Sequence, residues 1–431
     1  MKKILFIDSD KNALRNLRKQ LHSMQIVWDM FFVESGKDAL KLMESASFDV
    51  AVSEMNMPEM NGVELFDIII QKYPETVRIM HSENTDSKLT GASVRSSHQF
   101  LMKPCSPDII KCTIERTCKL QDLTNNEKLK QIITGVKNLP SLPRLYNLIT
   151  REMQSPDPSL AKIGTLISQD ISLSAKILQL VNSAYYSLPQ KITDPEQATI
   201  YLGSEVVKTV VLSNHVFSSF VEDAEMLGVD ITQMWNHSMQ VGVISGVIAR
   251  TEQAEKDEVE DAMISGVLHD IGKLILLKAP KKYKEIISFM DYTGSDFVDA
   301  EYAVLKTSHA EMGAYLLGLW GIPDSVVEIV AFHHGPSSLI ENVLEAACNS
   351  SGKNKNISTP TGGVLKSKSV NEYIKGLTAL ASVHTANALV NKKNGSSETT
   401  DLANIDMLYL KTLKLEDRLP IWEEAFNNEA I

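Results

Sequence analysis

The sequence contains few cysteines and no pair of them at metal-binding spacing. None of the four lies in a C-x-x-C motif; they are Cys105, Cys112, Cys118 and Cys348. This scarcity disfavours both a disulfide-stapled secreted domain and a cysteine-ligated zinc domain. We therefore expect reduced thiols.

Long apolar runs and an excess of basic residues are also missing. No apolar run approaches the roughly 18 residues that cross a bilayer. The first such run, Ile4–Ile7, is too short for the apolar region of a signal peptide. Lys and Arg number 43 against 54 Asp and Glu, which gives a net charge of −11 and a pI of about 5.5. Because the sequence offers neither a signal-like run nor a membrane-spanning run, we expect a cytoplasmic protein. Because an acidic chain repels phosphates and anionic lipids, we expect it to bind neither nucleic acid nor membrane.

Two hydrophobic patterns follow one another along the 431 residues, a length that favours two or three domains. In the first 120 residues, short β-like runs alternate with helical spacing. This pattern predicts a doubly wound, parallel, five-stranded α/β sheet with helices on both faces. The β-like runs are Ile4–Ile7, Met30–Val33, Val50–Val52, Arg78–Met80 and Phe100–Met102.

From about residue 123 the β-like runs mostly vanish and apolar residues recur at helical spacing, as at Met239, Val243 and Val247. We predict a first domain over residues 1–120, a polar linker over 121–130 and an all-α domain over 131–431, with its core in about 131–340. A polar stretch near 350–370 is predicted to be a flexible insertion.

Polar side chains follow four of the predicted strands. Asp8 ends the first strand, and Glu54 ends the third. Ser82 and Lys103 end the fourth and fifth. Because the carboxyl ends of parallel strands meet at one edge of the sheet, we expect these side chains to gather there. Clustered carboxylates hold a hard cation such as Mg²⁺, and a lysine with a hydroxyl can hold phosphoryl oxygens.

In the order of these residues, positions 1–120 resemble the receiver domains of bacterial response regulators. The resemblance implies that Asp8 belongs to the acidic pocket and that Ser82 is the switch hydroxyl. It likewise implies that Phe100 is the switch aromatic residue and Lys103 the pocket lysine.

Two positions depart from the family pattern. Glu54 stands where receivers carry the phosphoryl-accepting Asp, and Ser9 stands where they carry a second acid that binds Mg²⁺. The extra methylene moves the carboxylate by about 1.5 Å, and a misplacement of about 1 Å can cost ~100-fold in rate. Losing an acidic ligand weakens Mg²⁺ binding. We favour a receiver that Glu54 holds in a state resembling the phosphorylated one. An inactive scaffold, or residual phosphorylation on Glu54 or elsewhere, remains open.

Five of the ten histidines fall in four short segments of the helical part. In chain order these segments contain His237, His269-Asp270, His309 and His333-His334. Histidine and aspartate bind transition metals, and a metal so bound can activate water for phosphoester hydrolysis. Adjacent residues on a helix differ by about 100° in direction, so we expect His269 and Asp270 to approach one metal from a shared edge.

The order of these residues resembles the HD superfamily of metal-dependent phosphohydrolases. The surrounding segments are similar to its HDOD (HD-related output) branch over about residues 130–340; they include Leu139–Pro143, Ile167–Leu178, Leu268–Lys273 and Leu319–Pro323. The resemblance implies an all-helical regulatory or protein-interaction domain without an established common catalytic activity.

The HD-type ligand set is incomplete. His237, His269 and Asp270 match the first three ligands of the HD enzymes, but Asn387 stands where the distal Asp is expected. A metal there would lack one anionic ligand. The remaining histidines, His309, His333 and His334, resemble those of the cyclic di-GMP-hydrolysing HD-GYP branch, whose Gly-Tyr-Pro signature is absent here.

Two functions remain open. We favour a signal-transduction response regulator whose HDOD domain works through protein contacts. The alternative is a metal-dependent phosphohydrolase acting on a nucleotide phosphoester such as cyclic di-GMP. The expected partners are a downstream signalling protein, a histidine kinase and a second copy of the chain. The candidate cofactors are weakly bound Mg²⁺ at the receiver and a divalent transition metal at the histidine cluster.

Overall fold

The computed structural model describes residues 1–24, 27–83, 97–123, 143–182, 190–341, 357–358, 364–365, 378–393 and 405–428. The chain divides into two compact units. One comprises Met1–Arg144 with Leu316–Ile322, and the other comprises Leu145–Tyr315 with Pro323–Ile431. Most of the predicted linker and of the predicted insertion near 350–370 lies outside the described residues, so the predicted domain boundaries stay predictions.

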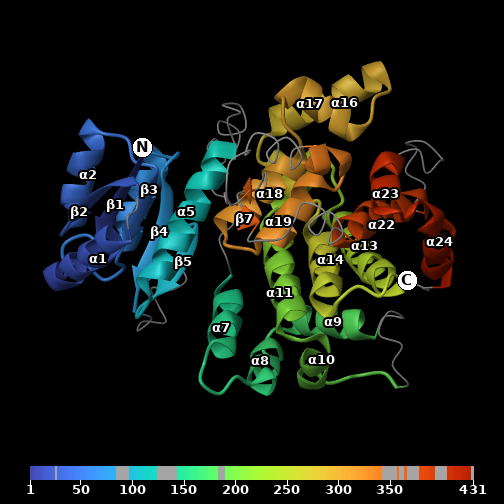
Figure 1. Cartoon of the computed structure of the whole chain (residues 1–431), viewed down its shortest axis with the longest axis horizontal. Coiled ribbons are helices and arrows are strands. Elements are labelled where there is room, and N and C mark those ends of the chain that lie inside the picture. Colours follow the sequence, from blue (N-terminus) through green and yellow to red (C-terminus); the bar gives the residue numbers. More distant parts are fainter. Residues whose placement is uncertain are drawn as a thin grey trace. The chain divides into compact units, whose positions relative to one another are not determined.

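The first unit contains a five-stranded parallel sheet in the order β2-β1-β3-β4-β5 (Figure 1). Its strands are β1 (Lys2–Ile7), β2 (Trp28–Val33), β3 (Val50–Ser53), β4 (Val77–Ser82) and β5 (Gln99–Met102). Each overlaps a β-like run of the sequence, so the predicted fold class is confirmed. The order reverses between β1 and β3, the point where ligands bind in open sheets of this kind.

Helices cover both faces of this sheet. The described helices are α1 (Lys11–Ser23), α2 (Gly36–Ser45), α3 (Gly62–Lys72) and α5 (Pro107–Leu123). Helix α1 packs beside α5, and α2 packs beside α3. Polar side chains fix where the helices begin: Asp10 caps α1, and Asn61 forms a capping box with Glu64 at α3.

Apolar side chains under the sheet hold the carboxyl ends of β1 and β3 in place. Leu5, Met55 and Phe66 are fully buried in one cluster, and Phe100 packs against it while remaining partly exposed. The central strands are apolar on both faces because helices cover both.

In the described residues of the second unit, the regular structure is helical apart from one antiparallel pair, β6 (Ile357–Ser358) with β7 (Val364–Leu365). The described helices that lie wholly or mostly in this unit are α7 (Arg144–Met153), α8 (Leu160–Ile167), α9 (Ile171–Val181), α10 (Pro195–Leu202), α11 (Ser204–Ser218), α12 (Val221–Leu227), α13 (Ile231–Thr251), α14 (Lys256–Leu268), α15 (Ile271–Leu277), α16 (Pro280–Thr293), α17 (Phe297–Leu305), α18 (His309–Leu319), α19 (Asp324–Phe332), α22 (Thr378–Lys393), α23 (Met407–Leu413), η3 (Glu416–Arg418) and α24 (Leu419–Asn428). Within the described part of the chain, none of the helices combines the length and apolar character needed to span a membrane.

Helices α13, α14 and α22 form the centre of this unit. Gly242 of α13 and Gly266 of α14 face each other so closely that a Cβ on Gly266 would lie 2.7 Å from the Gly242 Cα. This approach brings the α13 and α14 backbones together and sets His237 of α13 near His269, which follows α14.

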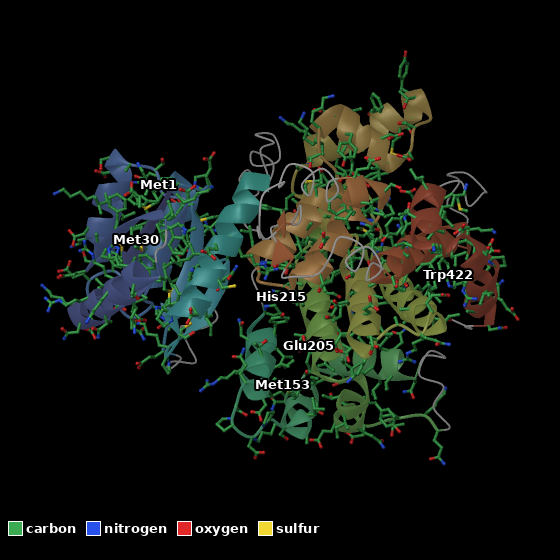
Figure 2. All side chains as sticks on the ribbon, in the orientation of Figure 1. Met1, Met30, Met153, Glu205, His215 and Trp422 are labelled. Atoms are coloured by element: carbon green, nitrogen blue, oxygen red, sulfur yellow. The ribbon has the colours of Figure 1, made fainter. Side chains whose placement is uncertain are left out.

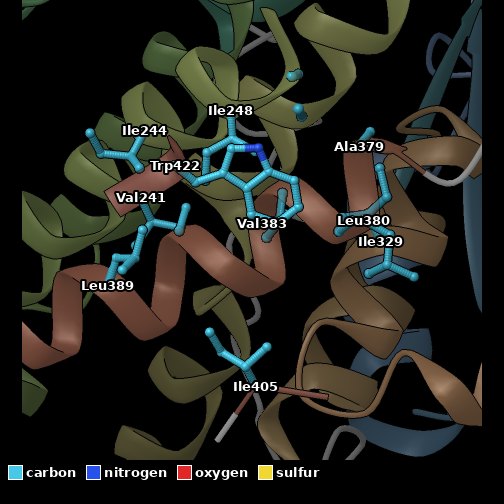
Figure 3. Packing of buried hydrophobic residues seen from close by; sticks show 14 of the residues in the cluster. Val241, Ile244, Ile248, Ile329, Ala379, Leu380, Val383, Leu389, Ile405 and Trp422 are labelled. Atoms are coloured by element: carbon cyan, nitrogen blue, oxygen red, sulfur yellow. The ribbon is translucent and has the colours of Figure 1, made fainter. Parts of the chain in front are cut away.

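The carboxyl-terminal helix anchors this core through Trp422, which is labelled on α24 in Figure 2. Figure 3 shows its fully buried indole among Ile244, Ile248 and Val383. The indole Nε1 donates a hydrogen bond to Glu252 Oε1 at 2.7 Å, so the one polar atom of the ring is satisfied.

Candidate functional site

The structure brings together Asp8, Glu54, Ser82 and Lys103, the four side chains expected at the strand ends. Lys103 Nζ donates to Asp8 Oδ2 at 2.6 Å and also contacts Glu54 Oε2. The Ser82 hydroxyl donates to Glu54 Oε1. The Glu54 carboxylate therefore links the fourth and fifth strand ends to the third.

Backbone amides complete the surroundings of Glu54. Its Oε1 accepts hydrogen bonds from Met55 N at 2.7 Å and Asn56 N at 3.2 Å. Gly62 opens α3 directly against the Glu54 carbonyl, where any Cβ would clash with the backbone. Glycine is therefore required at this position, a role that sequence reasoning did not assign.

These contacts keep Glu54 and Lys103 charged. Burial by itself would raise the pKa of Glu54, but the hydrogen bonds from Lys103 and Ser82 outweigh it and lower that pKa. Burial opposes the charge of Lys103 as well, yet Asp8 and Glu54 together raise its pKa. Burial, followed by the Lys103 charge, lowers the pKa of nearby His81 to about 4.

The pocket fits Mg²⁺ poorly. Both carboxylates of the cluster, Asp8 and Glu54, already pair with the Lys103 ammonium. Asp10 is exposed and accepts from Asn12 N at 2.8 Å as the cap of α1, and Ser9 is exposed. Mg²⁺ requires near-octahedral oxygen ligands, and no carboxylate of this cluster is free of a cation.

The second cluster lies within the helical unit around Asp270. Its Oδ1 is 3.2 Å from His309 Nε2 and 4.0 Å from His333 Nε2. Its Oδ2 is 3.4 Å from His269 Nε2 and 3.8 Å from His237 Nε2. Two overlapping groups with metal-ligand spacing share Asp270: one adds His309, His333 and His334, and the other adds His237 and His269.

Acceptors behind the rings orient the histidines. His269 Nδ1 donates to Gly266 O at 2.7 Å, and His333 Nδ1 donates to Val330 O at 2.8 Å. Carbonyl oxygens only accept, so these nitrogens carry the protons and Nε2 keeps the lone pair. Within the described residues, His269 Nε2, His333 Nε2 and Asp270 Oδ1 are buried without a hydrogen-bond partner. Buried lone pairs that converge in this way fit a divalent transition metal.

One expectation for this cluster is wrong. His269 and Asp270 do not lie side by side within one helix: His269 is the C-cap that follows α14, and Asp270 is the N-cap that precedes α15. The turn between the helices, rather than a shared helix edge, aims both side chains at the same point. Gly272 lets α15 lie directly against the His309 carbonyl of α18, where a Cβ would clash.

Burial tunes the cluster toward neutral imidazoles. It lowers the pKa of His333 and His334 well below the ordinary value, and it lowers the pKa of His237 to about 4. Neutral imidazole is the form that binds metals. For His309, burial is outweighed by the Glu301 charge, and the pKa is raised.

Asn387 lies where the incomplete ligand set predicts. It stands on α22, and its Oδ1 is 3.1 Å from His237 Nε2. Asn391 Nδ2 donates to the same oxygen at 3.1 Å, which fixes the orientation of the amide.

Sequence reasoning missed three residues of this site. Glu301, fully buried on α17, accepts from His309 Nδ1 at 2.7 Å. Lys273 donates to Asp270 Oδ2 at 2.8 Å, a pairing readable from its i+3 spacing. His384 donates through Nδ1 to the His333 carbonyl at 2.7 Å and so supports that turn.

Comparison with known proteins assigns the two clusters to two different domain families. Residues 4–115 match the response regulator receiver domain, and residues 139–336 match the HDOD domain. The chain therefore joins a response regulator receiver domain to an HDOD domain, as the resemblances implied.

Relatives match only part of the chain. An uncharacterised protein of Treponema pallidum is 26% identical over 231 residues, which are 52% of this chain and 43% of that protein. The hydrogenase transcriptional regulatory protein HoxA of Cupriavidus necator is 27% identical over 28% of this chain and 25% of its own length. The chain thus spans less than half the length of these relatives. A solved HDOD domain protein of unknown function from Geobacter sulfurreducens is 18% identical, with a TM-score of 0.48, over 69% of this chain and 88% of that one.

Proposed function

We propose that this response regulator is held by Glu54, without phosphorylation, in the arrangement of a phosphorylated receiver, and that its HDOD domain works through protein contacts. One observation carries the first part. The Glu54 carboxylate accepts from both the Ser82 hydroxyl and the Lys103 ammonium, the two groups expected to hold phosphoryl oxygens.

The same contacts make Glu54 a poor nucleophile. Met55 N, Asn56 N and Ser82 occupy Oε1, and Lys103 occupies Oε2. Attack on phosphorus would require these hydrogen bonds to break inside a pocket where the side chain is only 10% exposed. The anion at this position is thus permanent.

The test compares the full-length protein with the Ser9→Asp/Glu54→Asp variant in acetyl phosphate and Mg²⁺, by intact mass. We expect no adduct on the wild type and one phosphoryl group on the double variant, which regains the acceptor and the second acid. Ser9→Asp alone is the matched control and should stay unmodified. A stoichiometric phosphoryl adduct on the wild type would overturn the proposal.

Hydrogen exchange supplies a second readout over residues 77–83 and 97–102. The wild type should exchange slowly there and should not respond to acetyl phosphate. The double variant should exchange faster and should slow on phosphorylation. Equal exchange in all states would mean that Glu54 holds nothing in place.

The regulatory role of the helical domain rests on Asn387, a neutral amide beside His237 where an HD enzyme would have a carboxylate. The second candidate, a metal-dependent phosphohydrolase, is favoured by the unpartnered His269 and His333 nitrogens. Turnover of generic phosphoesters with Mn²⁺, Fe²⁺ or Ni²⁺ distinguishes the two. Activity that is lost in both His269→Ala and Asp270→Ala would establish the second.

The partners and the location belong to the same proposal. We place the protein in the cytoplasm, with a downstream signalling protein as its partner and a homodimer as its assembly. Light scattering during size-exclusion chromatography tests the dimer: a monomer at micromolar concentration would exclude it.

A further inference from the structure

The two overlapping ligand groups around Asp270 differ in how their atoms are already used. Lys273 Nζ donates to Asp270 Oδ2 at 2.8 Å, whereas Asp270 Oδ1 has no hydrogen-bond partner among the described residues. Oδ2 is the oxygen nearest His237 and His269, and Oδ1 is the oxygen nearest His309 and His333. A second cation beside Oδ2 would meet the Lys273 ammonium.

His237 and His333 differ in the same direction, whereas His269 has the same arrangement as His333. Asn387 Oδ1 accepts from Asn391, so it faces His237 Nε2 as an acceptor and the proton lies on that nitrogen. A protonated nitrogen has no lone pair for a metal. His333 presents the opposite arrangement, because its Nδ1 is the donor and its buried Nε2 has no hydrogen-bond partner in the part of the chain that the structure describes.

His309 has the strongest anchor. Glu301 Oε2 accepts both its ring Nδ1 at 2.7 Å and its backbone N at 3.1 Å, and both side chains are fully buried. A carboxylate behind a histidine fixes the ring and raises its basicity toward a metal. The anchors of His269 and His333 are neutral carbonyls.

The distances between ligand atoms in the group of Asp270, His309, His333 and His334 also suit one ion. His334 Nε2 lies 3.0 Å from His309 Nε2, a hydrogen-bond distance at which a proton joins the two nitrogens when no metal ion does. The separations of 3.0, 3.2 and 4.0 Å bracket the ~3.3 Å between neighbouring ligands of a tetrahedral ion bound at about 2.0–2.1 Å.

We infer that the helical domain holds one divalent transition-metal ion on Asp270, His309, His333 and His334, not on the group containing His237 and His269, and that Glu301 is its positioning residue. This deepens the regulatory role proposed for the helical domain and rests on that role, because four protein ligands close a tetrahedral ion to water and substrate, as in structural sites.

Zinc binding to the full-length, chelator-stripped protein tests the inference, with stoichiometry from elemental analysis and affinity from calorimetry. We expect one equivalent for the wild type and one for His237→Ala. His333→Ala and His334→Gln should each weaken binding strongly, and circular dichroism checks that both variants fold. His22→Ala, which removes an exposed histidine of α1, controls for surface binding.

Glu301→Gln isolates the positioning role, because it keeps the shape and an acceptor but removes the charge. We expect 10- to 100-fold weaker zinc binding, as for other such anchors. The matched control is Glu311→Gln, a nearby carboxylate that contacts Thr307 and the Ser308 amide instead of a histidine. Equal zinc affinity of the Glu301→Gln and Glu311→Gln variants would show that Glu301 does not position the metal site.

The inference is overturned by two zinc equivalents in the wild type or by loss of zinc in His237→Ala. A wild type that binds no zinc would overturn it too, yet would leave the Glu54 proposal standing. A phosphoryl adduct on the wild type would overturn the Glu54 proposal and leave the zinc inference standing. The failure of one can therefore be told from the failure of the other.

Discussion

Replacing Glu54 by glutamine should destabilise the receiver domain measurably. The variant loses the charged contact with Lys103, although Lys103 keeps Asp8 at 2.6 Å. The Glu54 and Lys103 side chains are only 10% and 19% exposed, so solvent screens the pair weakly. A hydrogen bond to a charged group contributes ~1.5–3 kcal/mol, and we expect a loss of about 2 kcal/mol from the free energy of unfolding.

Differential scanning calorimetry of the full-length protein measures this loss. For a domain of this size, about 2 kcal/mol lowers the Tm of the receiver transition by roughly 6–10 °C. The matched control is Glu59→Gln, which removes the same charge from an exposed pair with Lys37, where both side chains are 66% exposed. The control should leave the Tm unchanged. If both variants behave alike, the Glu54 carboxylate is not anchored as described, and the proposed receiver state fails with it.

The pH dependence of this difference has a defined sign. The folded state lowers the pKa of Glu54 below its ordinary value of 4.5. Its stabilisation is therefore complete above about pH 4.5 and is lost as the pH falls through the lower, folded-state value. The Tm gap between wild type and Glu54→Gln should stay constant from pH 7 to pH 5 and shrink below that. A gap that closes on raising the pH would contradict the assignment.

Two further substitutions test the packing that builds the helical site. Gly272→Ala places a methyl group against the His309 carbonyl and should prevent zinc binding or stable folding, whereas Gly335→Ala meets nothing closer than 3.9 Å and should be tolerated in the same solubility and zinc assays. Trp422→Ala empties a fully buried site and leaves Glu252 without the indole hydrogen bond, so urea unfolding should report a loss of ~3–5 kcal/mol from the helical unit; a loss below about 1 kcal/mol would mean that α24 is not part of its core.

The receiver could be predicted almost completely from sequence. Its strands are short apolar runs bounded by polar residues, and the parallel direction of the strands brings the residues that follow them to one edge of the sheet. Glu54, Ser82 and Lys103 are thus placed by topology alone. What could not be predicted is which oxygen of Glu54 meets which partner, because that depends on side-chain rotamers and on the amides of Met55 and Asn56.

The helical site was harder to predict, because helix packing and not chain order brings its parts together. The clustered side chains come from α13, the α14–α15 turn, α18 and the end of α19. Glu301 carried no signal, since nothing in an isolated Glu eight residues before His309 distinguishes it from a surface acid. The expectation that His269 and Asp270 share one helix edge is wrong because the sequence does not mark where α14 ends.

Both pockets contain a lysine paired with carboxylates, and the pairing decides what each can bind. Lys103 pairs with both Asp8 and Glu54, so neither carboxylate of this described cluster is free of a cation. Lys273 takes one oxygen of Asp270 and leaves Oδ1 facing the histidines. Removing Lys273 while completing the second ligand set, in Lys273→Ala/Asn387→Asp, should therefore raise zinc stoichiometry from one to two. Asn387→Asp alone should stay near one, because the ammonium still covers Oδ2. A double variant that still binds a single zinc would show that the lysine does not decide between the two groups.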